Sequence, residues 1–129
     1  MPRISRFNPK ELHAPLGRYS HVVGVAPGSR RVVLSGQVGV RPDGSVSEDA
    51  GEQAAQVVRN IQAALTSEGL TAADIVKVTI YLTDRAGIPA WRAHRETFLG
   101  EMEPASTLLL VAGLADPRFV IEVDVEAAG

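Results

Sequence analysis

Three carboxylates near the end of the chain are spaced in a way that could support acid–base chemistry. Glu122, Asp124 and Glu126 alternate with aliphatic residues in the segment 119–127. Successive side chains of a β-strand point to opposite faces, so the three acids are expected to share one face. Such a face is most often simply solvated, and its charges also discourage edge pairing. A partly desolvated carboxylate in a cleft can instead hold a water molecule and accept its proton.

The other reactive side chains lack the spacing of common metal or nucleophile motifs. The three histidines, His13, His21 and His94, include no pair at i, i+4 spacing, so the sequence predicts no metal site. Ser35 lies in Leu-Ser-Gly-Gln, which is not a nucleophile elbow. The chain has no cysteine, which excludes a thiolate zinc site and a cysteine nucleophile. Neither metal nor organic cofactor is expected.

Length and composition indicate one ordinary globular domain spanning residues 1–129. Hydrophobic residues make up 45% of the chain, and the formal net charge is −2. Because no basic patch is visible, a nucleic-acid partner is not expected. No apolar run approaches the roughly 18 residues of a membrane span, so no membrane partner is expected either. The first residues also lack the apolar core of a signal peptide, and the expected location is the cytoplasm.

Hydrophobic periodicity and turn residues predict an α/β domain. Residues 1–18 are expected to be irregular because three prolines interrupt them. Strands 22–25 and 31–40 flank a Pro-Gly turn and are expected to pair as a hairpin. The elements in chain order are strands at 22–25 and 31–40, a helix at 49–67, a strand at 75–83, a helix at 89–99, and strands at 105–112 and 119–127. This ββαβαββ order predicts a mixed sheet with both helices on one face.

Two of these elements have strongly patterned faces. In the helix at 49–67, apolar residues recur at helical spacing, and the glutamines Gln53 and Gln56 are assigned to the opposite, polar face. Gly69 is expected just beyond its C-terminus. In the strand at 75–83, the aliphatic residues from Val76 to Leu82 alternate with polar ones, which predicts one core-facing side.

The segment 107–112 is apolar at nearly every position, which is typical of a strand buried on both faces. Two helices on one side of the sheet leave the other side uncovered. Another copy of the chain is the simplest way to cover it. The pattern therefore predicts an oligomer without giving the number of subunits.

Several segments, taken in their order and spacing, resemble the YjgF/Rid (reactive intermediate deaminase) family. The resemblance covers about residues 15–127. It is carried by the segments Tyr19–Val25, Val32–Val38 with its Ser-Gly-Gln, Gln53–Leu65 with Gln53 and Asn60, Val76–Asp84, Pro104–Leu108 and Val120–Asp124.

This resemblance implies a chorismate-mutase-like fold and a homotrimer with a barrel-like core, outer helices and ligand clefts between subunits. It also implies an enzyme that hydrolyses small reactive imines and enamines, a detoxification that yields a 2-oxo acid and ammonia without a cofactor. The alternative is a non-catalytic, small-ligand-binding or chaperone-like trimer of the same fold. Fold alone does not decide between these two functions.

The resemblance also assigns roles to individual residues. Tyr19, Ser35, Gly36, Arg92 and Glu122 correspond to the family's cleft. Glu122 would hold the attacking water, Tyr19 would form a wall, and Ser35 with the adjacent backbone would position the substrate. Orientation and proton transfer are sufficient for adding water to an iminium carbon.

One position departs from the deaminating members of the family. Those members have an arginine that grips the substrate carboxylate, where this chain has Ser106 within Pro-Ala-Ser-Thr. The stretch from Leu114 to Glu122 is also one residue longer. Arg92 or Trp91 could anchor a substrate from the second helix, although a surface arginine is equally compatible with no role.

Overall fold

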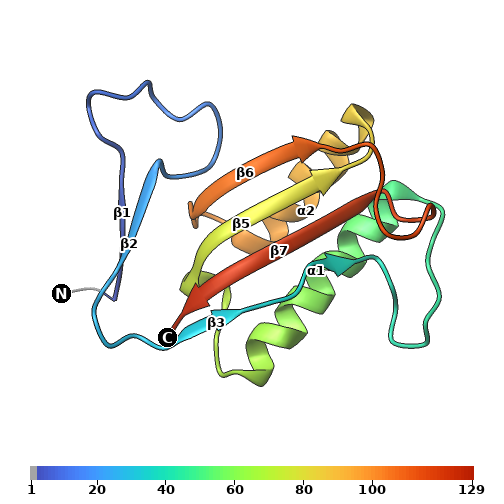
Figure 1. Ribbon diagram of the computed structural model, residues 1–129, viewed down its shortest axis with the longest axis horizontal. Coiled ribbons are helices and arrows are strands. Elements are labelled where there is room, and N and C mark those ends of the chain that lie inside the picture. Colours follow the sequence, from blue (N-terminus) through green and yellow to red (C-terminus); the bar gives the residue numbers. More distant parts are fainter. Residues whose placement is uncertain (1–2) are drawn as a thin grey trace.

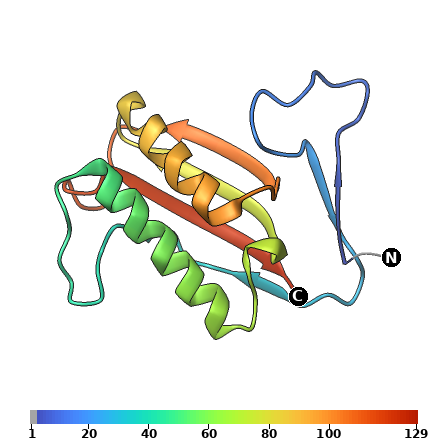
Figure 2. The same ribbon diagram turned by 180° about the vertical axis from the view of Figure 1, so that it is seen from behind.

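The computed structural model describes residues 3–129 as one mixed sheet covered on one side by two helices, with a small separate hairpin (Figures 1 and 2). Figure 1 views the uncovered face of the sheet, and Figure 2 shows both helices lying across the opposite face. The predicted fold class and the placement of both helices on one face are therefore confirmed.

The main sheet is built around the last strand of the chain. β7 (Ile121–Ala128) pairs antiparallel with β5 (Ile75–Leu82), β3 (Arg31–Val33) and β4 (Gln37–Val38). β5 also pairs in parallel with β6 (Ala105–Leu110), which forms one edge. A parallel pair needs a crossover connection. Helix α2 supplies it, and the sheet is mixed as the sequence predicts.

Local capping signals place the helix ends. α1 (Ala50–Ser67) begins after Asp49, whose side chain accepts a hydrogen bond from the backbone N–H of Glu52. It ends before Gly69, whose φ of +71° suits glycine. Short 3-10 turns, η1 (Ala72–Asp74) and η2 (Arg85–Gly87), precede β5 and α2.

Helix α2 (Ile88–Leu99) starts with a proline in its first turn, where the missing N–H costs nothing. Trp91, Phe98 and Leu99 are buried on the side of α2 that packs into the core. Together with α1, this helix covers the face of β5 and β7 that carries Ile80 and Val123. The core therefore lies in one layer between the two helices and the sheet.

The N-terminal region differs from the prediction. Residues Ile4–Phe7 form a strand, β1, which pairs antiparallel with β2 (Val22–Val25) in a two-stranded sheet of its own. The predicted pairing of β2 with the strand after it is wrong, because β3 pairs with β7 instead. The Pro27-Gly28 turn forms, but it redirects the chain to the main sheet. Pro9 and Pro15, which suggested irregular structure, follow β1 rather than interrupt it, and Pro2 lies outside the described residues.

The small hairpin is tied to the main domain by polar contacts. Arg6 Nη2 donates a hydrogen bond to the carbonyl of Ala73 at 3.2 Å, and Arg3 forms an ion pair with Asp74. Ser20, which follows the long loop, donates through its hydroxyl to the carbonyl of Glu103 at 2.6 Å. These contacts hold the loop 8–21 beside the start of β6.

Two face assignments made from periodicity are wrong. Gln53 and Gln56 are buried rather than exposed on α1, because both amides have hydrogen-bond partners inside the protein. In β5 a register irregularity falls between Ile75 and Lys77, so Ile75 takes the buried position and Val76 does not.

The face of the sheet opposite the helices has no cover in the single chain. On this face Leu109 of β6, which pairs with Tyr81, is 42% exposed, and Val33 of β3, which pairs with Glu126, is 60% exposed. Large aliphatic side chains left open on a sheet face are surface that another chain could cover. Within residues 3–129, neither helix combines the length and the apolar character needed to cross a membrane.

Candidate functional site

The residues predicted to form the site fall into two groups in this chain. Tyr19, Trp91, Arg92 and Ser106 line a pocket of about 480 Å³. We call this the α2 pocket, and its complete lining is Leu16, Gly17, Arg18, Tyr19, Ile80, Trp91, Arg92, Arg95, Glu96, Ser106 and Leu108. The second group, which we call the Glu122 group, consists of Ser35, Gly36 and Glu122.

The two groups lie on opposite faces of the sheet. Ile80 lines the α2 pocket and pairs with Val123, and both side chains are buried on the helix side. Glu122 is the neighbour of Val123 in β7, so its side chain points to the uncovered face. The cleft implied by the family resemblance lies between subunits, and in a single chain its seven predicted residues lie in these two separate groups.

Within the Glu122 group, the glycine allows a close approach of side chain to backbone. A Cβ added to Gly36 would overlap the carboxylate of Glu122. The approach follows from pairing, since Glu122 lies opposite Val38 in the β4–β7 ladder. Ser35 precedes this glycine and is exposed. The Ser-Gly segment thus brings backbone directly against the carboxylate, with a hydroxyl alongside.

Glu122 differs from the two acids that share its face. Asp124 accepts a hydrogen bond from the Tyr81 hydroxyl at 2.8 Å, and Glu126 forms an ion pair with Arg31. Among residues 3–129, no donor or cation is in contact with the Glu122 carboxylate. The hydrogen bond to Asp124 raises the pKa of Tyr81, and burial and the nearby charges of Asp124 and Glu122 add to the effect.

Two side chains of α1 hold the strands that carry this group. The Gln53 amide donates to the carbonyl of Arg118 at 2.8 Å and accepts from the backbone N–H of Val120 at 3.0 Å, which fixes the approach to β7. Asn60 donates to the carbonyls of Val38 and Val40 at 3.1 and 3.0 Å, which fixes β4. The Gln53 and Asn60 spacing noted in the sequence therefore has a positioning role.

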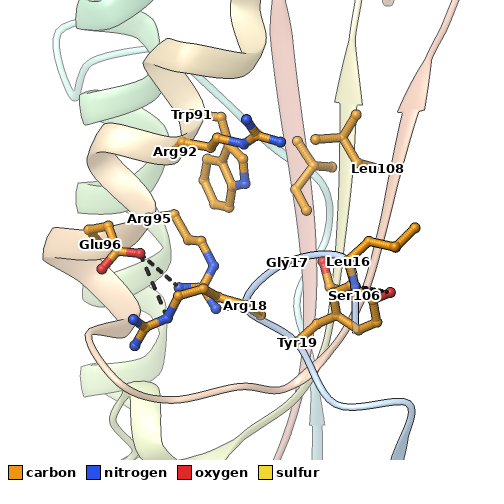
Figure 3. Close-up of a pocket in the computed structure, with 11 residues that line it drawn as sticks. Leu16, Gly17, Arg18, Tyr19, Trp91, Arg92, Arg95, Glu96, Ser106 and Leu108 are labelled. Carbon is orange, nitrogen blue, oxygen red and sulfur yellow. Dashed lines mark hydrogen bonds and ion pairs between the residues drawn. The ribbon is translucent and has the colours of Figure 1, made fainter. Parts of the chain in front are cut away.

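The α2 pocket lies between helix α2 and the loop that follows β1 (Figure 3). Trp91 is 3% exposed and forms part of the helix side. Tyr19 lies on the loop side, where its hydroxyl accepts a hydrogen bond from the backbone N–H of Leu16 at 3.0 Å. Ser106 and Leu108 come from β6 and complete the wall opposite α2.

Arg95 is a pocket residue that was not predicted from the sequence. It is 9% exposed, and its Nη2 donates to the carbonyls of Met102 (3.1 Å) and Arg18. Its Nη1 is buried without a hydrogen bond, and the closest carboxylate oxygen, of Glu96, is 3.7 Å away. Burial lowers the pKa of Arg95, although arginine stays charged at neutral pH. Its position four residues after Trp91, within the apolar stripe of α2, was the available signal.

Arg92 is exposed at the mouth of the same pocket. In Figure 3 its guanidinium points away from Glu96 and toward the side where Leu108 lies. Within the described part of the chain it forms no ion pair. The same range contains no group of three or more His, Asp or Glu side chains arranged to hold a metal ion.

The fold and these two groups define a small α/β domain with a polar-lined pocket on one side of its sheet and an unpartnered carboxylate on the other. A family model described as endoribonuclease L-PSP matches residues 10–129. The chain belongs to this family, the YjgF/Rid family.

Several relatives are similar to this chain over most of their length. The 2-iminobutanoate/2-iminopropanoate deaminase of Salmonella typhimurium is 36% identical over 119 residues, which cover 89% of this chain and 90% of that protein. The protein of the same name from Escherichia coli K12 is 34% identical over the same coverage. A RutC family protein of Pyrococcus abyssi is 31% identical, covering 88% of this chain and 86% of its own.

Solved structures are similar in fold. The Rid family protein YyfB of Yersinia pestis superposes with a TM-score of 0.88 at 27% identity, covering 98% of this chain and 99% of that one. RidA from an Antarctic Psychrobacter gives a TM-score of 0.72 at 29% identity, covering 96% and 98%.

Proposed function

We propose that this chain is a hydrolase that deaminates reactive imines or enamines of small metabolites, with Glu122 holding the attacking water. The observation that carries the proposal is the state of Glu122. It is the acid on the uncovered face that has no partner within residues 3–129, and it lies against the backbone of Gly36. A carboxylate without a bound cation or donor is available to accept a proton from water.

The reaction needs few groups. Glu122 takes a proton as the water oxygen bonds to the iminium carbon, which gives a carbinolamine. The carboxyl group then returns its proton to the nitrogen and, as the C–N bond breaks, takes up the proton of the carbinolamine hydroxyl. The products are a carbonyl compound and ammonia, and the proton left on Glu122 is released to solvent. Ser35 and the adjacent backbone orient the substrate. Alignment of this kind supplies much of the rate gain in reactions between bound groups.

The proposal also includes a cleft between subunits of a homotrimer. Tyr19 and Glu122 lie on opposite faces of one sheet, so a site containing both takes them from two chains. Leu109 of β6 and Val33 of β3 are exposed on the uncovered face and provide apolar surface that a neighbouring copy would bury. Sedimentation velocity at micromolar concentration should give a trimer. A stable monomer would contradict the shared cleft.

Glu122→Gln tests the water-holding role. We expect the rate of 2-oxo acid and ammonia release from freshly generated imines to fall by about 10²-fold, the usual scale for loss of a general base. Glu126→Gln is the matched control, because Glu126 shares the strand face but is already paired with Arg31. Equal activity of Glu122→Gln and the parent would remove Glu122 from the mechanism.

The substrate is expected to differ from that of the deaminating relatives. Ser106 stands where the deaminating members have a carboxylate-binding arginine, so turnover of 2-iminopropanoate and 2-iminobutanoate should be weak. We expect Ser106→Arg to raise kcat/KM for these two compounds by about 10-fold or more, since a bidentate pair improves both binding and orientation. Robust activity of the parent would show that another group already replaces the arginine.

A non-catalytic ligand-binding trimer is the second candidate, because the α2 pocket can bind a ligand without help from this chain's own Glu122. No turnover by the parent or by Ser106→Arg, together with ligand binding, would favour it. RNA cleavage is not proposed, because the net charge of −2 offers little for phosphate neutralisation.

A further inference from the structure

Tyr81 is close to two carboxylates of the uncovered face. In the β5–β7 ladder it pairs with Glu122, and its hydroxyl donates a hydrogen bond to Asp124, two residues further along β7, at 2.8 Å. Directly paired side chains have Cβ atoms about 5 Å apart, and an aromatic side chain also reaches the diagonal neighbour. The charges of both acids contribute to raising the pKa of Tyr81, which agrees with this closeness.

The phenol can serve only one of these acids at a time, because its hydroxyl has a single proton to donate. That proton is given to Asp124. Among residues 3–129, the Glu122 carboxylate is left without a hydrogen bond or an ion pair. The acid that is paired directly with Tyr81 is thus free, and the acid that is diagonal to Tyr81 holds the hydroxyl.

The Glu122 carboxylate is turned toward the other side of its strand. β7 lies between β5 on one side and β3 with β4 on the other (Figure 1). A Cβ added to Gly36, in the segment between β3 and β4, would overlap the Glu122 carboxylate. The carboxylate therefore lies against this backbone rather than against the phenol. A hydrogen bond from a phenol to a carboxylate is stronger than one between neutral groups, so this arrangement requires that the hydroxyl is already engaged elsewhere.

We propose that Asp124 is a positioning residue, which holds the Tyr81 hydroxyl away from Glu122 and so keeps Glu122 free to bind the attacking water. Without Asp124, the phenol would turn to its directly paired acid. A carboxylate that accepts a hydrogen bond from a phenol is a weaker base and has less capacity to hold water. The effect on turnover rests on the deaminase function proposed above, whereas the exchange of hydrogen-bond partners requires no turnover.

Substitutions of Asp124 test this role. Asp124→Ala should lower kcat for imine hydrolysis by about 10-fold, because the new bond between Tyr81 and Glu122 must break before Glu122 can accept a proton. Asp124→Asn should keep kcat within about 3-fold of the parent value, because its amide oxygen still accepts from the phenol. Glu126→Ala is the matched control on the same strand face, since Glu126 is paired with Arg31, and it should leave kcat unchanged.

Removing the hydroxyl separates this role from a structural one. Adding Tyr81→Phe to Asp124→Ala should restore kcat to the value of Tyr81→Phe alone, because phenylalanine leaves no donor beside Glu122. If the hydrogen bond only ties β5 to β7, the double variant will be no more active than Asp124→Ala. That result, or full activity of Asp124→Ala, would overturn the proposal.

A titration of Tyr81 tests the exchange of partners without turnover. In a Tyr19→Phe background Tyr81 is the remaining tyrosine, so the ultraviolet absorbance follows its phenol alone. After Asp124→Ala the midpoint should stay above the ordinary value of about 10, because the phenol then donates to the Glu122 carboxylate. Adding Glu122→Gln should bring the midpoint to about 10. A midpoint of about 10 after Asp124→Ala alone would show that the phenol does not turn to Glu122, and would overturn the proposal.

The two measurements together separate this proposal from the deaminase function. A raised midpoint after Asp124→Ala, in a protein that hydrolyses no imine, would support the exchange of partners and reject the deaminase. Imine hydrolysis by the parent, together with a midpoint of about 10 after Asp124→Ala, would reject the exchange and leave the deaminase standing.

Discussion

The two faces of the main sheet come from the same strands but have different surroundings. On the helix side, Ile80, Leu82 and Val123 keep at most 1% of their surface exposed. On the other side, Tyr81 and Glu122 are only half-buried, and they are the direct neighbours in sequence of those core residues. Because side chains alternate along a strand, one residue packs in the core while its neighbour is available for polar contacts on the opposite face.

This separation predicts which substitutions affect folding and which affect function. A change on the helix side removes packing that every folded chain needs. A change on the uncovered side leaves that packing intact and alters either a polar contact or the surface available to another copy. The experiments below compare matched residues on the two faces.

The largest effect is expected from Leu82→Ala compared with Leu109→Ala. Leu82 is 1% exposed, so its truncation should cost about 2–5 kcal/mol of unfolding free energy. Leu109 is 42% exposed and pairs with Tyr81 on the uncovered side, so the intrinsic cost should be about 0.5 kcal/mol or less. Urea denaturation measures both.

Measuring both variants at several protein concentrations tests whether another copy covers Leu109. If another copy covers Leu109, the decrease in unfolding free energy caused by Leu109→Ala should depend on protein concentration. The decrease caused by Leu82→Ala should be large at every concentration. If both substitutions lower the unfolding free energy equally and at every concentration, the two faces do not differ in burial and in contact with another copy.

The next effect is expected from Gly36→Ala, which changes the uncovered face alone. The added methyl group would overlap the Glu122 carboxylate and force it to move. A displacement of about 1 Å at a reacting group can cost about 10²-fold in rate, so kcat should fall by about 10- to 100-fold. Gly113→Ala is the control, since a Cβ there meets nothing within 4 Å. Full activity of Gly36→Ala would show that the position of the Glu122 carboxylate does not matter for the reaction.

The sequence predicted the elements that depend on local signals. The boundaries of α1 were predicted to within a residue, because apolar residues recur at helical spacing along it and Gly69 marks its end. The uncovered face was also predictable, from two helices and an all-apolar segment at 107–112. The pairing of β1 with β2 was not, because a turn signal does not identify the partner of the strand that follows it.

The sequence proposes residues for the candidate site but not how one chain groups them. Alternation assigns Glu122, Asp124 and Glu126 to one face and the family resemblance singles out Glu122, whereas its separation from Tyr19 depends on the three-dimensional register. The burial of Gln53 and Arg95 was not predicted, because polar residues are usually exposed and only the backbone carbonyls that accept their hydrogen bonds make burial possible.

The smallest effect concerns the titration of Tyr81. Its hydrogen bond to Asp124 raises the pKa of the phenol above the ordinary value of about 10. The chain has two tyrosines, so in a Tyr19→Phe background the absorbance change at 295 nm reports Tyr81 alone. We expect a midpoint above 10 in this background, and a midpoint closer to 10 after Asp124→Asn.

The same shift has a consequence for stability. With a pKa raised in the folded protein, the folded state holds a proton that the unfolded state has released between about pH 10 and the higher folded value. The contribution of Tyr81 is therefore fully present below pH 10 and is lost as the pH rises through its folded pKa. A second copy over this face would add desolvation and raise the pKa further, so dissociating the assembly should lower the midpoint. A titration midpoint of 10 in every state and variant would show that Tyr81 and Asp124 do not interact. Asp124 would then lack a hydrogen-bond partner, as Glu122 does, and the difference between the two acids would disappear.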